Sequence, residues 1–110
     1  MLSETKIELE ARNPLVNRLR RWSIEIGQDL LGMWIVDVEF GRIGSKGRHL
    51  RHVYPDQPAA VACLGRALRR RATAQERIGV AYRCVSSSLD AQEAIRKVGI
   101  DVSIANTIIG

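Results

Sequence analysis

The part of this chain best suited to binding chemistry is a glycine-punctuated turn at residues 40–48. Phe40 opens the turn, and glycines recur at every third position, at Gly41, Gly44 and Gly47. Glycine accepts positive φ and close backbone approach, so such a turn can present N–H groups to an anion. Three cations that suit phosphate oxygens are interleaved with these glycines: Arg42, Lys46 and Arg48. A phosphate-binding site and a tight hairpin with solvated charges explain this pattern equally well.

Two familiar phosphate motifs do not describe this turn. A P-loop ends in Gly-Lys followed by Ser or Thr and leads into a helix, whereas Gly47 leads into an extended run. The dinucleotide-binding fingerprint has a different glycine spacing and also opens a helix. Any phosphate binding here therefore uses another scaffold.

A second group of cations lies on a predicted amphipathic helix at residues 57–73. Asp56 is placed as its N-cap, and Pro58 fits the first turn, where no N–H is needed. Apolar residues recur there with helical spacing and predict a face packed on a sheet. Arginines lie on the opposite arc or beside it: Arg66, Arg69, Arg70 and Arg71. They either follow a phosphate backbone or are simply solvated.

Strict alternation of polar and apolar residues predicts the sheet that this helix covers. The alternating segments are joined by short turns, as in a meander: residues 6–11, 20–26, 33–40 and 48–54. Phe40 shares an apolar face with Trp34, so its ring belongs either to the core or to the surface. A short run at residues 80–85 is expected to add an edge strand. The predicted fold class is α+β: an antiparallel β-sheet meander with one principal amphipathic helix packed on it, plus a short C-terminal helical or extended appendage.

The end of the chain is predicted to form that appendage. Residues 1–85 make the domain, and residues 86–110 pack on it or form a homodimer contact. Asp90 and Glu93 have the spacing of a helix capping box, and Gly99 suits a helix stop. The following residues are too apolar to leave in water: Ile100, Val102, Ile104, Ile108 and Ile109.

The charge distribution favours a polyanionic partner. The chain has 110 residues with 45% hydrophobic and 26% charged side chains, as in ordinary globular proteins, and a net charge of +5. Residues 12–83 carry 14 basic and 6 acidic side chains between two mildly acidic ends. This asymmetry indicates nucleic acid first and an anionic membrane second. With no bilayer-length apolar run and no secretory signal, we expect a cytoplasmic protein without membrane association.

The cysteines and histidines do not predict a metal site. Cys63 and Cys84 stand alone, without the ligand spacing of a zinc site, and are expected to be reduced. His49 and His52 have no third ligand near them in sequence and are expected to be ordinary strand residues. No metal and no cofactor are predicted.

The acidic residues of the third strand do not predict a catalytic pair. Asp37 and Glu39 lie two apart on one face of a strand. They are expected to pair with neighbouring-strand arginines such as Arg21 or Arg51. The sequence also lacks a nucleophile and base in recognisable order. An enzyme is therefore not predicted.

Residues 40–44, Phe-Gly-Arg-Ile-Gly, resemble the Trp-Gly-Arg-Ile-Gly motif of the WGR domain. This domain lies beside the catalytic domain in many poly(ADP-ribose) polymerases and also occurs in small bacterial proteins. The resemblance covers about residues 7–82 and includes the strand around Trp22, the basic helix and Tyr82 near its end. It implies the same antiparallel sheet with one packed helix.

The resemblance also implies a function in binding DNA ends. In the polymerases, the motif tryptophan packs against the end of a strand and the motif arginine makes polar contacts nearby. Phe40 and Arg42 correspond to these residues. Phe40 lacks the indole N–H, Arg48 replaces a common glutamine, and Arg21 replaces a usual aromatic residue. These departures favour general affinity for the backbone over recognition of one specific end.

Two hypotheses follow. The first is a non-catalytic module that binds nucleic acid, DNA more than RNA, at its backbone or ends with little base specificity. Its predicted contact residues are Phe40, Gly41, Arg42, Lys46, Arg48, Arg66, Arg69 and Arg70. The second is a protein–protein adaptor, since the motif arginine of the polymerases also serves contacts between domains.

Overall fold

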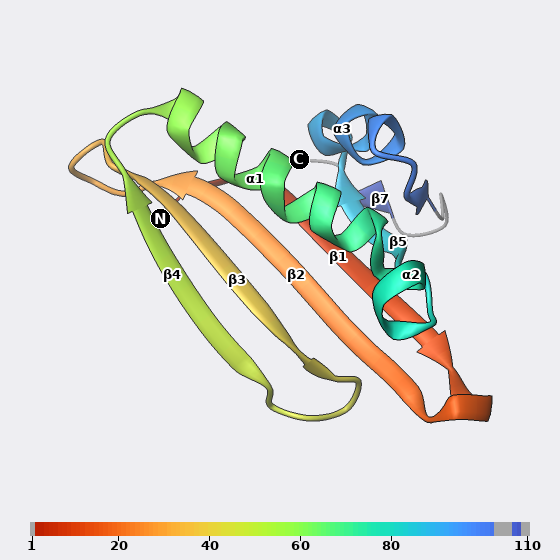
Figure 1. Cartoon of the computed structure of the whole chain (residues 1–110). Coiled ribbons are helices and arrows are strands. Elements are labelled where there is room, and N and C mark those ends of the chain that lie inside the picture. The colour runs from red at the N-terminus through yellow and green to blue at the C-terminus, as the bar shows by residue number, and fades with distance from the viewer. Residues whose placement is uncertain (1, 103–106, 109–110) are drawn as a thin grey trace.

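The alternating segments build four long antiparallel strands joined by short turns (Figure 1). The computed structural model describes residues 2–102 and 107–108. The strands are β1 (Leu2–Asn13), β2 (Arg18–Gln28), β3 (Trp34–Arg42) and β4 (Arg48–Tyr54), and each pairs with the next. The predicted meander is confirmed. β1 and β2 extend beyond the alternating residues because backbone pairing continues past the last buried side chain.

A fifth strand, β5 (Arg83–Ser88), adds to the other side of β1. The sheet order is β4-β3-β2-β1-β5, and two short strands, β6 (Asp101–Val102) and β7 (Thr107–Ile108), pair parallel with β5. The expected strand at residues 80–85 is therefore displaced toward the C-terminus. Residues 80–82 instead connect it to the preceding helix, and Val80 packs in the core.

The principal helix α1 (Gln57–Ala72) forms as its capping residues predict. The Asp56 carboxylate accepts a hydrogen bond from the Ala59 N–H at 2.9 Å, which satisfies a donor that the first turn leaves open. Its apolar stripe faces the sheet through Ala60, Leu64 and Leu68. Three arginines lie in the last turn, where the helix dipole favours cations.

The remaining helices are short. One-turn 3-10 helices occupy Pro14–Val16 and Leu89–Ala91. The two other α-helices have five and six residues: α2 (Ala74–Ile78) and α3 (Gln92–Lys97). The expected capping box at Asp90 is wrong: no side chain caps α3, and the Asp90 carboxylate accepts a hydrogen bond from the Thr5 hydroxyl at 2.7 Å. Asp90 thus contacts β1 and does not cap α3.

The core lies between the sheet and its helices. Trp22, Ile24 and Val36 from β2 and β3 pack with Ile95 of α3 and Ile100 in one buried cluster. The proposed division at residue 85 falls within β5 and stays a prediction. Ile104 and Ile109 lie outside the described residues.

The sheet therefore has two unlike faces. α1 and α3 lie over one of them, the helix-bearing face (Figure 1). Leu9, Trp22 and Val36 lie on this face, in the buried cluster that also contains residues of α1 and α3. On the open face, successive strands present polar residues such as Glu8 and Asp37. In the described part of the chain, no helix combines the length and apolarity needed to span a bilayer.

Candidate nucleic-acid interface

The β3–β4 turn is held by close backbone packing at Gly47. Gly47 has φ +67°, and a Cβ there would lie 2.4 Å from the Phe40 carbonyl oxygen. Gly41 faces it: a Cβ on Gly41 would lie 2.8 Å from the Gly47 Cα. Arg21 then donates from Nη2 to the carbonyl oxygens of Ser45, at 2.9 Å, and Lys46, at 2.6 Å. The glycines and this guanidinium together fix the loop at the end of the sheet.

Phe40 lies at the end of β3 on the helix-bearing face. It is opposite Trp22 on β2 and Arg48 on β4, and directly paired residues of antiparallel strands share a face. Its ring is half-buried and packs against the core cluster. Phe40 is thus neither a fully buried core residue nor a free ring, which resolves the alternative that the sequence left open.

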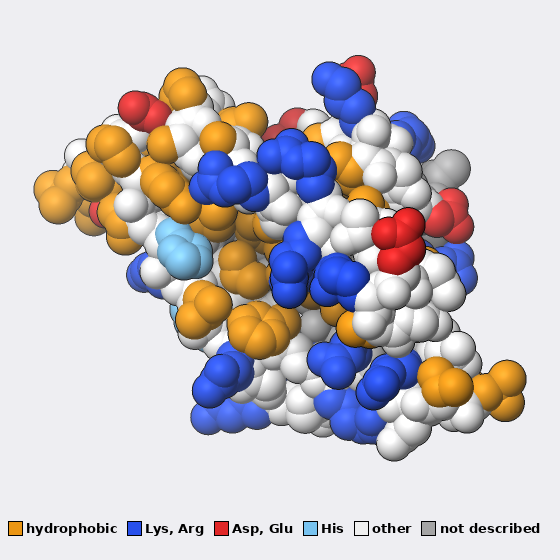
Figure 2. All heavy atoms as spheres, viewed as in Figure 1, with side chains coloured by type: hydrophobic (Ala, Val, Ile, Leu, Met, Phe, Trp, Pro, Cys, Tyr) orange, Lys and Arg blue, Asp and Glu red, His pale blue; other side chains and the backbone are white. Residues whose placement is uncertain are grey.

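Arginines from three elements surround this ring. A pocket of about 160 Å3, which we call the arginine pocket, is lined by Phe40, Gly41 and Tyr82. The other charged lining residues come from β2, α1 and α2: Arg20, Arg21, Arg70, Arg71 and Arg77. Figure 2 shows this face of the molecule, where Lys and Arg side chains gather around a partly apolar area below α1.

The other predicted contact residues are spread around this pocket. Arg66 lines a neighbouring cavity together with Phe40 and Arg70. Arg42 is exposed and donates to the Asn17 side-chain oxygen at 2.8 Å, and Lys46 is exposed in the loop. Arg69 lies apart, because its guanidinium lies along α1 over Gly65. The fold therefore brings Phe40, Gly41, Arg66 and Arg70 together, with Arg48 on the same face.

Arg71 has a structural role as well as a charge. Its guanidinium carbon lies 4.8 Å from the centroid of a Trp22 ring, a cation–π contact with a residue that is only 1% exposed. Desolvation lowers the pKa of Arg71, although an arginine remains charged at physiological pH. The indole N–H of Trp22 is buried and has no hydrogen-bond partner among the residues that the structure describes. The Arg71 guanidinium thus lies over Trp22, where it lines the arginine pocket.

Arg20 and Arg77 line the arginine pocket although the sequence did not single them out. A signal for Arg20 exists, since it lies two residues before Trp22 and therefore shares its face of β2. Arg77 lies in α2, a five-residue helix whose position depends on how α1 ends. No local pattern indicates that it reaches this pocket.

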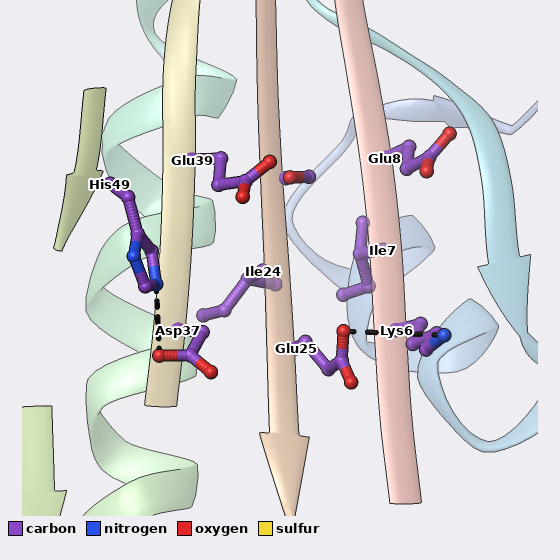
Figure 3. A pocket seen from close by; sticks show the side chains of 9 residues that line it. Lys6, Ile7, Glu8, Ile24, Glu25, Asp37, Glu39 and His49 are labelled. Carbon is purple, nitrogen blue, oxygen red and sulfur yellow. Dashed lines mark hydrogen bonds and ion pairs between the residues drawn. The ribbon is translucent and has the colours of Figure 1, made fainter. Parts of the chain in front are cut away.

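The open face carries the opposite chemistry. A cavity of about 280 Å3 is lined by several carboxylates: Glu8, Glu25, Asp37 and Glu39 (Figure 3). Asp37 accepts hydrogen bonds from Arg51, at 2.7 and 2.9 Å, and lies 3.0 Å from Nε2 of His49. The predicted pairing of Asp37 with Arg51 is confirmed. Arg21, the other predicted partner, instead donates hydrogen bonds to backbone carbonyl oxygens of the β3–β4 turn.

This environment stabilises the charged form of the Asp37 carboxylate. The hydrogen bond from Arg51 is the main reason that the pKa of Asp37 lies below its ordinary value, with His49 contributing in the same direction. Among the residues that the structure describes, no three His, Cys, Asp or Glu side chains are arranged to hold a metal ion. Cys63 and Cys84 are both free thiols.

Comparison with protein families gives one result. The model of the WGR domain matches residues 5–75, which is more than half of the chain. Comparison with curated proteins and with solved structures found no match. The match includes most of β1, all of β2, β3 and β4, the β3–β4 turn and all of α1.

Proposed function

Because the chain belongs to the WGR domain family, a family of non-catalytic domains that bind nucleic acid, we propose that it is a DNA-binding module of the cytoplasm. It would hold a DNA backbone or DNA end against the helix-bearing face, with little base specificity. Duplex DNA is preferred over RNA in this proposal.

The observation that carries the proposal is the meeting of arginines around Phe40. Arg20 comes from β2, Arg70 and Arg77 come from the consecutive helices α1 and α2, and all three line one pocket with the ring. Within the described part of the chain, none of these three arginines lies within 4 Å of a carboxylate. Cations without local counterions and a partly exposed aromatic ring suit phosphates and the stacked end of a strand.

The test is the salt dependence of binding to duplex DNA. Four to six phosphate contacts, about the number this face offers, give a slope of log affinity against log salt near −4 to −5. Arg42→Ala or Arg48→Ala is expected to flatten the slope by about one unit each. Arg51→Ala is the matched control, since it removes the same charge from the open face and should leave the slope unchanged.

Probes with different ends sharpen this test. Blunt, nicked and 5′-phosphorylated DNA duplexes and an RNA duplex are compared in one titration at low salt. Phe40→Ala should weaken binding to the DNA ends by about 1–3 kcal/mol if the ring stacks there. Thermal unfolding of the same variant separates that loss from a loss of stability. Absence of binding by every probe at low salt would refute the proposal.

A second candidate function is a protein–protein adaptor. The observation that favours it is the β2–β3 turn, where Leu30 and Leu31 are 103% and 88% exposed. Large apolar side chains projecting from a turn suit a protein surface. Replacing both with Ser should leave DNA binding unchanged and disrupt only such a contact.

A further inference from the structure

A second cavity lies on the other side of Phe40, between α1 and the β3–β4 half of the sheet. We call it the α1 groove. It has a volume of about 370 Å3, in the range of small-molecule sites. The strands supply its apolar floor through Val38, Phe40 and Leu50, and α1 supplies Ala67 and Cys63. Figure 2 shows the same arrangement as an apolar area bordered by Lys and Arg side chains.

The floor and the rim of this groove differ in chemistry. Leu50 is 48% exposed, and Val38 and Phe40 are half-buried, so the floor is accessible apolar surface. Arg66 and Arg70 lie exposed at the rim, one turn apart on α1, and Arg71 closes the inner end. A ligand that fits must be apolar at its centre and negatively charged at its edge.

We propose that the α1 groove binds an unpaired base of a single-stranded overhang, with the flanking phosphate held by Arg66 and Arg70. A base offers a flat apolar surface to Phe40 and Leu50, and its own backbone carries the charge that the rim requires. The inference rests on the proposed function and goes beyond it, because it names unpaired nucleotides as the preferred ligand and α1 as one wall of their site. The shared ring of Phe40 makes the groove continuous with the arginine pocket.

Three probes test this directly. The first is a blunt duplex, the second is the same duplex with a three-nucleotide overhang, and the third carries that overhang with abasic sites. The overhang is expected to bind about tenfold more tightly than the blunt duplex, because base–aromatic stacking adds to the charge term. The abasic overhang, which keeps every phosphate, should bind like the blunt duplex after correction for its added charge.

Two variants of the same strand provide a matched pair. Leu50 and Val53 are both half-exposed residues of β4, 48% and 52%, but they lie on opposite faces of the sheet. Leu50→Asn should reduce the preference for the overhang to about twofold and leave blunt-duplex binding unchanged. Val53→Asn should change neither. Equal thermal unfolding of the two variants shows that folding is not the cause.

The unmodified protein offers a second readout. Cys63 lines the groove and is partly exposed, whereas Cys84 is fully buried. The overhang probe should slow modification of Cys63 by a thiol reagent, and the abasic probe should not. Protection by an acidic peptide and not by the overhang would assign the groove to a protein ligand and overturn the inference.

The outcomes separate the two proposals. If the blunt duplex binds and the overhang gives no preference, the groove inference is overturned while the proposed function stands. An equal preference for the base-containing and abasic overhangs also overturns the inference, since charge then explains it. If no probe binds at low salt, both proposals fail.

Discussion

The two faces of this sheet differ in how their charges are compensated, although they are built from the same strands. On the open face, cations are paired: Arg51 with Asp37, Arg12 with Glu10 at 2.9 Å, and Lys6 with Glu25 at 4.0 Å. On the helix-bearing face, Arg48, Arg66 and Arg70 have no carboxylate within 4 Å in the described part of the chain.

This difference shows why the net charge alone understates the binding potential of the molecule. Acidic side chains reduce the net charge of the chain to +5. Four of them, Glu8, Glu25, Asp37 and Glu39, line the cavity on the open face, as Figure 3 shows. Alternation along a strand sends successive residues to opposite faces, so Asp37 and Glu39 are separated from Phe40. A polyanion that approaches the helix-bearing face meets mainly unpaired cations.

The largest expected effect is a loss of stability from a substitution in the β3–β4 turn. Gly47→Ala places a Cβ 2.4 Å from the Phe40 carbonyl oxygen and 2.7 Å from Nη2 of Arg21, at φ +67°. We expect a loss of about 3 kcal/mol in the free energy of unfolding, from backbone strain and lost loop contacts. Gly44→Ala is the control: at φ +87° with nothing within 4 Å, it should cost about 1 kcal/mol. Equal losses in urea denaturation would contradict the packing argument.

Next in size is the contrast in DNA binding between paired and unpaired arginines. The double variant Arg66→Ala/Arg70→Ala should weaken binding to duplex DNA about tenfold or more near 50 mM salt. Arg12→Ala/Arg51→Ala removes the same charge from the open face and should weaken it less than about twofold. Fluorescence anisotropy measures both. Similar losses of DNA affinity in the two double variants would contradict the assignment of the DNA interface to the helix-bearing face.

A smaller effect concerns the contribution of the Asp37–Arg51 pair on the open face to the free energy of unfolding. The pKa of Asp37 is lowered in the folded protein, so its stabilisation is present above the unfolded pKa, about 3.9, and is lost as the pH falls through the folded pKa. Asp37→Asn should therefore lower the free energy of unfolding by about 1 kcal/mol at pH 7, and by progressively less in acid. In an Arg51→Ala background the substitution should cost less. A difference that is independent of pH would argue against the pairing.

The smallest effect tests whether the faces act independently. Glu39→Lys raises the net charge by two on the open face, away from the arginine pocket. At physiological salt the Debye length is about 8 Å, so charges on the far side of the sheet are largely screened. DNA affinity should rise by less than about twofold, as measured in the same anisotropy titration. A severalfold increase would show that the open face also contacts DNA.

Much of this architecture can be predicted from local sequence patterns. Alternation fixes the strands and the face to which each side chain points, so the pairing of Asp37 with Arg51 is predictable from neighbouring strands. The start of α1 is equally local, because Asp56 and Pro58 act within one turn. These features depend on residues close in sequence or on a two-residue period, and few other arrangements satisfy them.

The tertiary structure decides which cations meet. The register of β2 with β3 places Trp22 opposite Phe40, and only the packing of α1 and α2 brings Arg70 and Arg77 to that ring. Arg69, on the same helix, lies away from it over Gly65. Helical spacing gives the arc on which an arginine lies, whereas its distance from a residue on another element depends on long-range docking. The charge of this protein was therefore determined by its sequence, and the shape of its binding surface by the packing of α1 and α2 against the sheet.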